Sequence, residues 1–176
     1  MQLMQRLLDD LTHLYDQALG SLELDRKPTT LGPWLMQEIV PWREAAQDKG
    51  LSWQAHIPGN LPTVNIDADR IAQALGNVLG NAVKYTPAGG EVVVSADAID
   101  GSVCVHVRDT GVGIPQEEQQ RIFEPFYRGQ SSRRFPQGMG LGLSITRDLL
   151  VAHGGHIDVK SEVEQGSTFT LCLPVV

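Results

Sequence analysis

The sequence predicts an α/β domain of about six strands and three or four longer helices. Two observations predict this class. Runs of alternating apolar and polar residues recur along the chain, and stretches with apolar residues at helical spacing lie between them. The length of 176 residues suits one compact domain with a short appended element.

The composition is that of a soluble globular domain. Hydrophobic residues make up 41% of the chain and charged residues 20%, close to the averages of about 45% and 25%. The net charge of −7 repels phosphodiester backbones, so the sequence gives no support to nucleic-acid binding. No stretch reaches the roughly 18 to 20 apolar residues of a membrane helix, and residues 1–12 lack the pattern of a signal peptide.

The N-terminal part of the chain predicts two helices separated by a linker. Apolar residues recur at helical spacing over residues 1–20, and a glycine ends the pattern. Residues 21–32 contain turn and linker residues, including Pro28, which places a boundary near this proline. The second helix is predicted over residues 33–49.

The remainder predicts strands, two helices and one long loop. Asp67 is a suitable N-cap for a helix over residues 67–84, and another helix is predicted over residues 143–153. Residues 109–142 are rich in glycine and poor in periodic apolar positions, which is typical of a functional loop. The predicted strands cover residues 51–57, 63–66, 91–96, 102–108, 156–160 and 167–173, with an antiparallel pair across Asp100 and Gly101.

The two cysteines, Cys104 and Cys172, lie far apart in two of these strand-like runs. Such an arrangement favours buried free thiols over a disulfide framework or a metal cluster. The cysteines therefore predict a reducing, cytoplasmic compartment.

One polar stripe lies on the helix predicted over residues 67–84. Asn77, Asn81 and Lys84 follow one another at i, i+4 and i+7, beside the apolar stripe that faces the core. Asparagine oxygens suit Mg²⁺, and a lysine one turn on can meet phosphates. Taken alone, the stripe also fits a solvated helix face.

Two glycine-containing segments flank the long loop. Asp109 directly follows a strand, and Gly111 and Gly113 after it permit close approach of a ligand, although a strand-ending turn gives the same pattern. Residues 138–144 alternate glycine with other residues and open a helix, which offers bare amides and a helix N-terminus to a phosphate. Neither the dinucleotide fingerprint nor the phosphate loop matches this segment.

Aromatic and basic residues lie inside the loop. Phe123 and Phe126 precede Arg128, with Arg133 and Arg134 beyond them. Aromatic side chains in such a segment either pack on a partner or anchor the loop to the body of the domain, while the arginines meet an anion or the solvent.

Taken together and in this order, these elements resemble the ATP-binding domain of two-component sensor histidine kinases, in the superfamily that includes gyrase-type and heat-shock chaperone ATPases (GHKL). The likeness covers about residues 28–176. Residues 77–86 look like the family's N box, residues 109–113 like its G1 box, residues 123–126 like its F box and residues 138–142 like its G2 box. The resemblance implies the Bergerat fold, a two-layer α/β sandwich of a mixed, largely antiparallel sheet and packed helices, with a glycine-rich ATP lid.

The resemblance also implies a role for each matched residue. Asn81 would ligate Mg²⁺ with support from Asn77, Lys84 and Arg128 would meet phosphates, and Asp109 would accept from the adenine amino group. Gly113 would let the base lie against the backbone, and Phe123 and Phe126 would anchor the lid. The remaining residues expected to line the ATP site are Tyr85, Gly111, Ile114, Gly138, Met139, Gly140, Leu141, Gly142 and Leu143.

Asn77 discriminates between functions within the superfamily. The ATP-hydrolysing members that this sequence resembles carry a glutamate there, as general base for water. An amide cannot take that proton, so the resemblance implies a kinase that transfers the γ-phosphoryl group of ATP to a histidine, with Asn77, Lys84 and Arg128 as its catalytic residues. The alternatives are an ATPase, a nucleotide-dependent binding module without kinase activity, and a serine kinase acting on an anti-sigma partner.

The phosphorylated histidine of this family lies in a box that none of the five histidines matches. We therefore expect residues 1–27 to be the end of a dimerisation domain's second helix with its linker, and residues 28–176 to be the catalytic domain. The expected partners are the histidine-bearing dimerisation domain of the same kinase and a response regulator. The parent is expected to be a homodimer, this piece a monomer, and its location cytoplasmic, whether or not the parent is anchored in a membrane.

Overall fold

The computed structural model describes residues 23–129 and 138–176. The strands are β1 (Lys27–Thr30), β2 (Ser52–His56), β3 (Thr63–Ile66), β4 (Glu91–Ile99), β5 (Ser102–Asp109), β6 (His156–Glu162) and β7 (Gly166–Pro174). The helices are α2 (Leu31–Glu38), α3 (Val40–Asp48), α4 (Ala68–Tyr85) and α6 (Gly142–Ala152), with two short 3₁₀ helices, η1 (Gln116–Glu118) and η2 (Arg121–Phe123). The predicted α/β class is confirmed.

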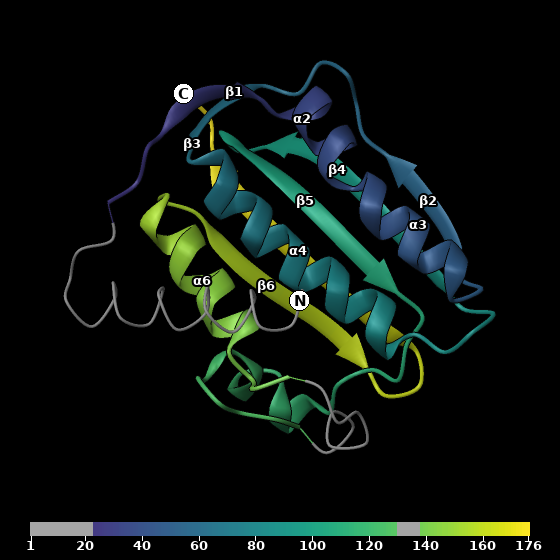
Figure 1. Cartoon of the computed structure of the whole chain (residues 1–176). Coiled ribbons are helices and arrows are strands. Elements are labelled where there is room, and N and C mark those ends of the chain that lie inside the picture. The colour runs from purple at the N-terminus through teal and green to yellow at the C-terminus, as the bar shows by residue number, and fades with distance from the viewer. Residues whose placement is uncertain (1–22, 130–137) are drawn as a thin grey trace.

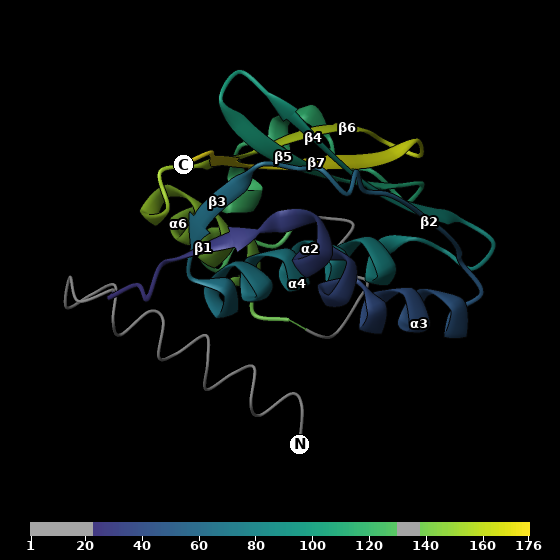
Figure 2. The same ribbon diagram turned by 90° about the horizontal axis from the view of Figure 1, so that it is seen from above.

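The described residues form two layers, a five-stranded sheet and the helices that cover one of its faces (Figures 1 and 2). The strand order is β2-β4-β5-β7-β6, with β1 and β3 paired separately. Only the β2–β4 pair of the larger sheet is parallel, and the other pairs are antiparallel. The expected mixed, largely antiparallel sheet is therefore present.

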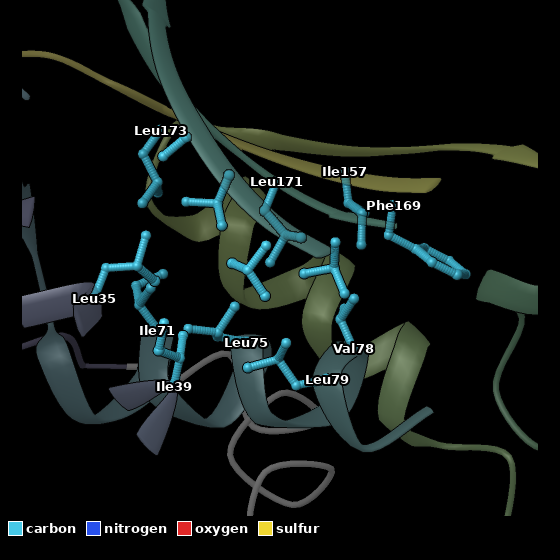
Figure 3. Packing of buried hydrophobic residues seen from close by; sticks show 14 of the residues in the cluster. Leu35, Ile39, Ile71, Leu75, Val78, Leu79, Ile157, Phe169, Leu171 and Leu173 are labelled. Carbon is cyan, nitrogen blue, oxygen red and sulfur yellow. The ribbon is translucent and has the colours of Figure 1, made fainter. Parts of the chain in front are cut away.

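The core lies between α4 and the sheet. Leu75, Val78 and Leu79 of α4 point toward Phe169 and Leu171 of β7 (Figure 3), and all five side chains are buried. Replacing one such leucine with alanine costs about 2–5 kcal/mol of stability. The helix begins at the predicted place, because the Asp67 side chain accepts a hydrogen bond from the Arg70 amide.

A buried histidine joins α6 to the start of α4. The His153 ring donates through Nδ1 to the Leu149 carbonyl (2.7 Å) and accepts at Nε2 from the Asp67 amide (3.0 Å). Burial lowers the pKa of His153, and the accepting nitrogen requires the neutral ring. His153 is therefore a structural residue.

The region before β2 differs from the sequence prediction in two ways. The single helix predicted over residues 33–49 is two helices, because Pro41 lacks the amide that a continuous helix needs and instead lies in the first turn of α3. The predicted linker contains β1, which pairs with β3 from Lys27 opposite Ile66 to Thr30 opposite Thr63. The helix predicted over residues 1–20 lies outside the described residues.

The prediction of free thiols is wrong. Cys104 of β5 lies directly opposite Cys172 of β7, with their Cα atoms 4.1 Å apart, and the two form a disulfide. The pairing of β5 with β7 brings together residues 68 positions apart, which the sequence pattern did not reveal. The argument for a reducing compartment from the cysteines therefore no longer holds.

Within the described parts of the chain, none of the helices combines the length and the hydropathy needed to cross a membrane.

We predict that reducing the disulfide destabilises the domain. A cross-link of this kind stabilises by about 2–4 kcal/mol, chiefly by restricting the unfolded chain. Urea unfolding with and without dithiothreitol measures the difference, and the Cys104→Ala/Cys172→Ala variant, which has no disulfide to reduce, is the control. Two titratable thiols in unfolded protein that was never reduced would contradict the disulfide.

Candidate nucleotide site

The polar stripe of α4 borders a cavity of about 470 Å³, a volume typical of small-molecule sites. Asn77, Asn81 and Lys84 all line it, while the opposite side of the helix lies in the core. Lys49, the residue that follows α3, donates from Nζ to the Val83 and Lys84 carbonyls at 2.7 and 2.8 Å and so caps the end of α4. The stripe is therefore the wall of a cavity and not a solvated helix face.

The glycine segment 138–142 forms a second wall, and α6 begins at its last residue. The Gly140 carbonyl accepts from the Phe126 amide (2.9 Å), and a side chain at Gly140 would lie 2.6 Å from the Tyr127 carbonyl. Gly140 also has a φ of +77°, which glycine adopts without strain. The segment therefore offers backbone groups and a helix N-terminus to the cavity.

Two cations face one end of the cavity. Lys84 and Arg128 both line it, and burial together with the charge of Arg128 lowers the pKa of Lys84. The Lys84 ammonium also lies 3.6 Å from the position that a side chain at Gly138 would take. These two side chains place positive charge on the lining of the cavity in a chain of net charge −7.

A buried carboxylate, Asp109, lies at the end of β5, and neither of these cations contributes to its pKa shift. Asp109 is 5% exposed and accepts a hydrogen bond from the Gly111 amide at 2.8 Å. Burial raises the pKa of Asp109 to about 6, and hydrogen bonds from the Gly111 and Ser167 amides oppose the rise. At pH 7 Asp109 is therefore largely ionised and able to accept from a ligand's amine.

The glycines after Asp109 are required by packing within the protein. A side chain at Gly111 would lie 2.7 Å from the Asp109 carboxylate and 2.8 Å from the Tyr85 carbonyl. A side chain at Gly113 would collide with the Glu162 carbonyl, and its φ is +68°. The backbone of Gly113 nevertheless borders the cavity.

The two phenylalanines of the loop behave differently. Phe123 is 9% exposed and packs into the core, as an anchor should. Phe126 is 65% exposed and has a φ of +63°. The expectation that Phe126 anchors the loop by its side chain is wrong, because the side chain is exposed and does not pack into the core.

The cavity gathers most of the site residues that the sequence predicted. Gly111, Phe123 and Phe126 are not part of its lining, and Arg133 and Arg134 lie outside the described residues. The predicted residues that line it are Asn77, Asn81, Lys84, Tyr85, Asp109, Gly113, Ile114, Arg128, Gly138, Met139, Gly140, Leu141, Gly142 and Leu143.

The cavity is also lined by residues that the sequence did not predict. Trp42 of α3 packs on α4, where a side chain at Gly76 or Gly80 would lie 3.2 Å from the indole. Two glycines one turn apart inside a helix are unfavourable, so Gly76 and Gly80 could have indicated that another side chain packs closely against α4. The other missed polar and aromatic residues are Lys49, Glu118, Tyr127, Ser167 and Phe169.

The fold and the cavity define the class of an ATP-binding domain. The chain belongs to the family of histidine kinase-, DNA gyrase B-, and HSP90-like ATPases, whose model matches residues 66–176.

Curated relatives extend the likeness over nearly the whole chain. The adaptive-response sensory kinase SasA of Rippkaea orientalis is 39% identical over 176 residues, covering 99% of this chain and 44% of the relative. The sensor protein SrrB of Staphylococcus aureus is 33% identical over 97% of this chain and 29% of the relative. The chain thus spans less than half the length of these relatives.

Solved structures of histidine kinases share the fold. Full-length ShkA in complex with AMPPNP has a TM-score of 0.84 and 35% identity, covering 97% of this chain and 35% of ShkA. The catalytic domain of ThkA has a TM-score of 0.74 and 28% identity, covering 85% of this chain and 95% of that domain. ThkA in complex with the response regulator protein TrrA has a TM-score of 0.75 and 25% identity, covering 98% of this chain and 49% of that chain.

We predict that adenosine binding weakens in acid through Asp109. The carboxylate accepts from an amine, and protonation below a pKa of about 6 removes that acceptor. With ten protonated molecules for each ionised one at pH 5, the affinity should fall about tenfold from its value at pH 7.5. Adenosine is the probe for calorimetry because it carries no phosphate that titrates in this range.

The Asp109→Asn variant is the control for this pH dependence. It should bind adenosine weakly and with the same affinity at both pH values, since its amide does not titrate. Equal adenosine affinity of the unmodified chain at pH 7.5 and pH 5 would remove the assigned role of Asp109.

Proposed function

We propose that this chain is the catalytic part of a sensor histidine kinase: it binds Mg-ATP and transfers the γ-phosphoryl group to a histidine on a dimerisation domain. One observation carries the proposal, the polarity of the cavity. A buried carboxylate, Asp109, and two cations, Lys84 and Arg128, line the same cavity, and neither cation contributes to the pKa shift of Asp109. ATP has the matching polarity, with an amine on its base and negative charge on its phosphates.

Each end of the cavity would hold one part of ATP. Asp109 would accept from the adenine amine, beside the apolar side chain of Ile114. The amides of the glycine segment 138–142, acting as part of a lid, would donate to phosphate oxygens, and Lys84 and Arg128 would supply the opposing charge. Because Lys84 is fixed on α4 and Asp109 at the end of β5, ATP would be held in one direction only.

The magnesium site would be built from amide and phosphate oxygens. Among residues 23–129 and 138–176 no group of three histidine, cysteine or acidic side chains could hold a metal. Asn81 lines the cavity and offers an amide oxygen, with Asn77 in support, and Mg²⁺ accepts such ligands together with phosphates and waters. The ion would neutralise phosphate charge.

The described lining favours phosphoryl transfer over hydrolysis. Its acids are Asp109, which faces the base, and Glu118, whose carboxylate packs against Gly129. Asn77 occupies the position where hydrolysing relatives carry a glutamate, and its amide donates to the Gly142 carbonyl at 3.0 Å. In the transfer, an imidazole nitrogen forms a bond to the γ-phosphorus while the bond to the bridging oxygen breaks, which releases ADP, and a base outside this chain takes the imidazole proton.

The proposed partners lie outside this chain. They are the dimerisation domain of the same kinase and a response regulator that receives the phosphoryl group, as supported by the similarity to the ThkA–TrrA complex. We place the reaction in the cytoplasm, where ATP is available, and we expect the parent to be a dimer and this piece a monomer, with residues 1–27 and 28–176 as its two parts.

We predict that the chain binds ATP with little turnover of its own. Calorimetry with and without Mg²⁺, followed by assay of released phosphate, measures both properties. Adding a separately produced dimerisation domain with γ-labelled ATP should yield phosphohistidine on that domain. Brisk hydrolysis by the chain alone would favour an ATPase, and binding without any transfer would favour a binding module.

We predict further that Asn81→Ala removes most of the Mg²⁺ dependence of ATP affinity, because it removes the proposed ligand oxygen. Asn65→Ala, an equivalent change on the exposed face of β3, is the matched control and should behave like the unmodified chain. Unchanged Mg²⁺ dependence in Asn81→Ala would exclude Asn81 as the ligand.

A further inference from the structure

A buried hydroxyl lies where α4 meets α6, next to the glycine segment. Thr146 of α6 is 0% exposed, and its Oγ1 lies 2.8 Å from the Gly142 carbonyl and 3.3 Å from the Ala74 carbonyl of α4. It also lies 3.4 Å from Nδ2 of Asn77. None of the four boxes contains Thr146, and it does not line the cavity.

Thr146, Asn77 and the Gly142 and Ala74 carbonyls form a hydrogen-bonded cluster, in which the direction of the bonds can be assigned. The Thr146 hydroxyl has one proton, which it donates to one of the two carbonyls, and it accepts from Asn77. The Asn77 amide nitrogen also donates to the Gly142 carbonyl at 3.0 Å. A carbonyl only accepts, so the nitrogen of Asn77 must face it, and Oδ1 is left as the group that can meet a ligand.

The cluster joins two parts of the cavity that come from different elements. Gly142 is the last residue of the glycine segment and the first of α6, while Asn77 belongs to the polar stripe of α4. The helices lie side by side here (Figure 1). The apolar contact beside the cluster is small, consisting of Ala74, Leu141, Ile145 and Leu149.

We propose that Thr146 is a positioning residue for phosphate binding. Its hydroxyl fixes the Gly142 carbonyl, and with it the end of the glycine segment, against Asn77, and it holds the Asn77 amide with Oδ1 available. The inference rests on the proposed function, since it concerns the same ATP site. It assigns Thr146 to the phosphate end, and not to the base end at Asp109.

The experiment compares ATP and adenosine binding by Thr146 variants. Thr146→Ala and Thr146→Ser both lose the methyl group and differ from each other only by the hydroxyl, while Thr146→Val keeps the shape of threonine. Loss of one neutral hydrogen bond changes an equilibrium by about 3- to 10-fold. We expect Thr146→Ala and Thr146→Val to bind Mg-ATP that much more weakly than Thr146→Ser, and all three to bind adenosine within twofold of the unmodified chain.

Thr170→Ala is the control for loss of a threonine hydroxyl elsewhere. Thr170 bonds His106 at 3.0 Å through its hydroxyl, and it alternates with the core residues Phe169 and Leu171, so it lies on the other face of the sheet. The Thr170→Ala variant should bind ATP and adenosine with the same affinities as the unmodified chain. Circular dichroism checks folding, and because alanine is the strongest helix former, the Ala–Ser pair decides the question if the valine variant does not fold.

The possible outcomes separate this inference from the proposed function. Equal ATP affinity of the Ala, Val and Ser variants would overturn the role of Thr146, as would an equal loss for ATP and adenosine, which would indicate a general structural role. If the unmodified chain binds adenosine but shows no gain from the phosphates, or binds neither ligand, the proposed function fails and the inference fails with it.

Discussion

Burial of one face of α4 against the sheet is the constraint on which the rest of the structure depends. Val78 and Leu79 contribute to the core, while their neighbours Asn77 and Asn81 line the cavity. A helix that buries its apolar face has no rotational freedom left, because turning it would expose those side chains to water. The free energy that folds the domain therefore also fixes the direction of the polar stripe.

The electrostatics of the cavity follow from the same arrangement. The domain is acidic overall, yet Lys84 and Arg128 meet at one end of the cavity, where burial and their mutual repulsion disfavour the charged lysine. At the other end burial disfavours the ionised form of Asp109. The cavity therefore suits a ligand that carries an amine for Asp109 and negative charge for Lys84 and Arg128.

Patterns within single elements predicted the fold and most of the site. The periodicity of α4 and the N-cap Asp67 were correct almost to the residue, since both depend on neighbours in the sequence. Contacts between distant elements were not predictable. The pairing of Cys104 with Cys172 depends on the register of β5 on β7, and the exposure of Phe126 depends on how its loop packs against the rest of the domain. Motif matching named residues by type, but packing decided which ones face the cavity.

Glycine shows why motif and packing are hard to separate in this site. In the family motif, Gly111 and Gly113 are expected to leave room for a ligand. In this structure a side chain at either position would also collide with the protein's own backbone or with Asp109. The two roles are compatible, because the direction blocked at Gly113 is toward Glu162 and its backbone still borders the cavity. A larger residue there would disturb the turn behind the site before it touched a ligand. Gly111 and Gly113 are therefore required by the packing of the domain itself, and this packing also leaves the space that a nucleotide would fill.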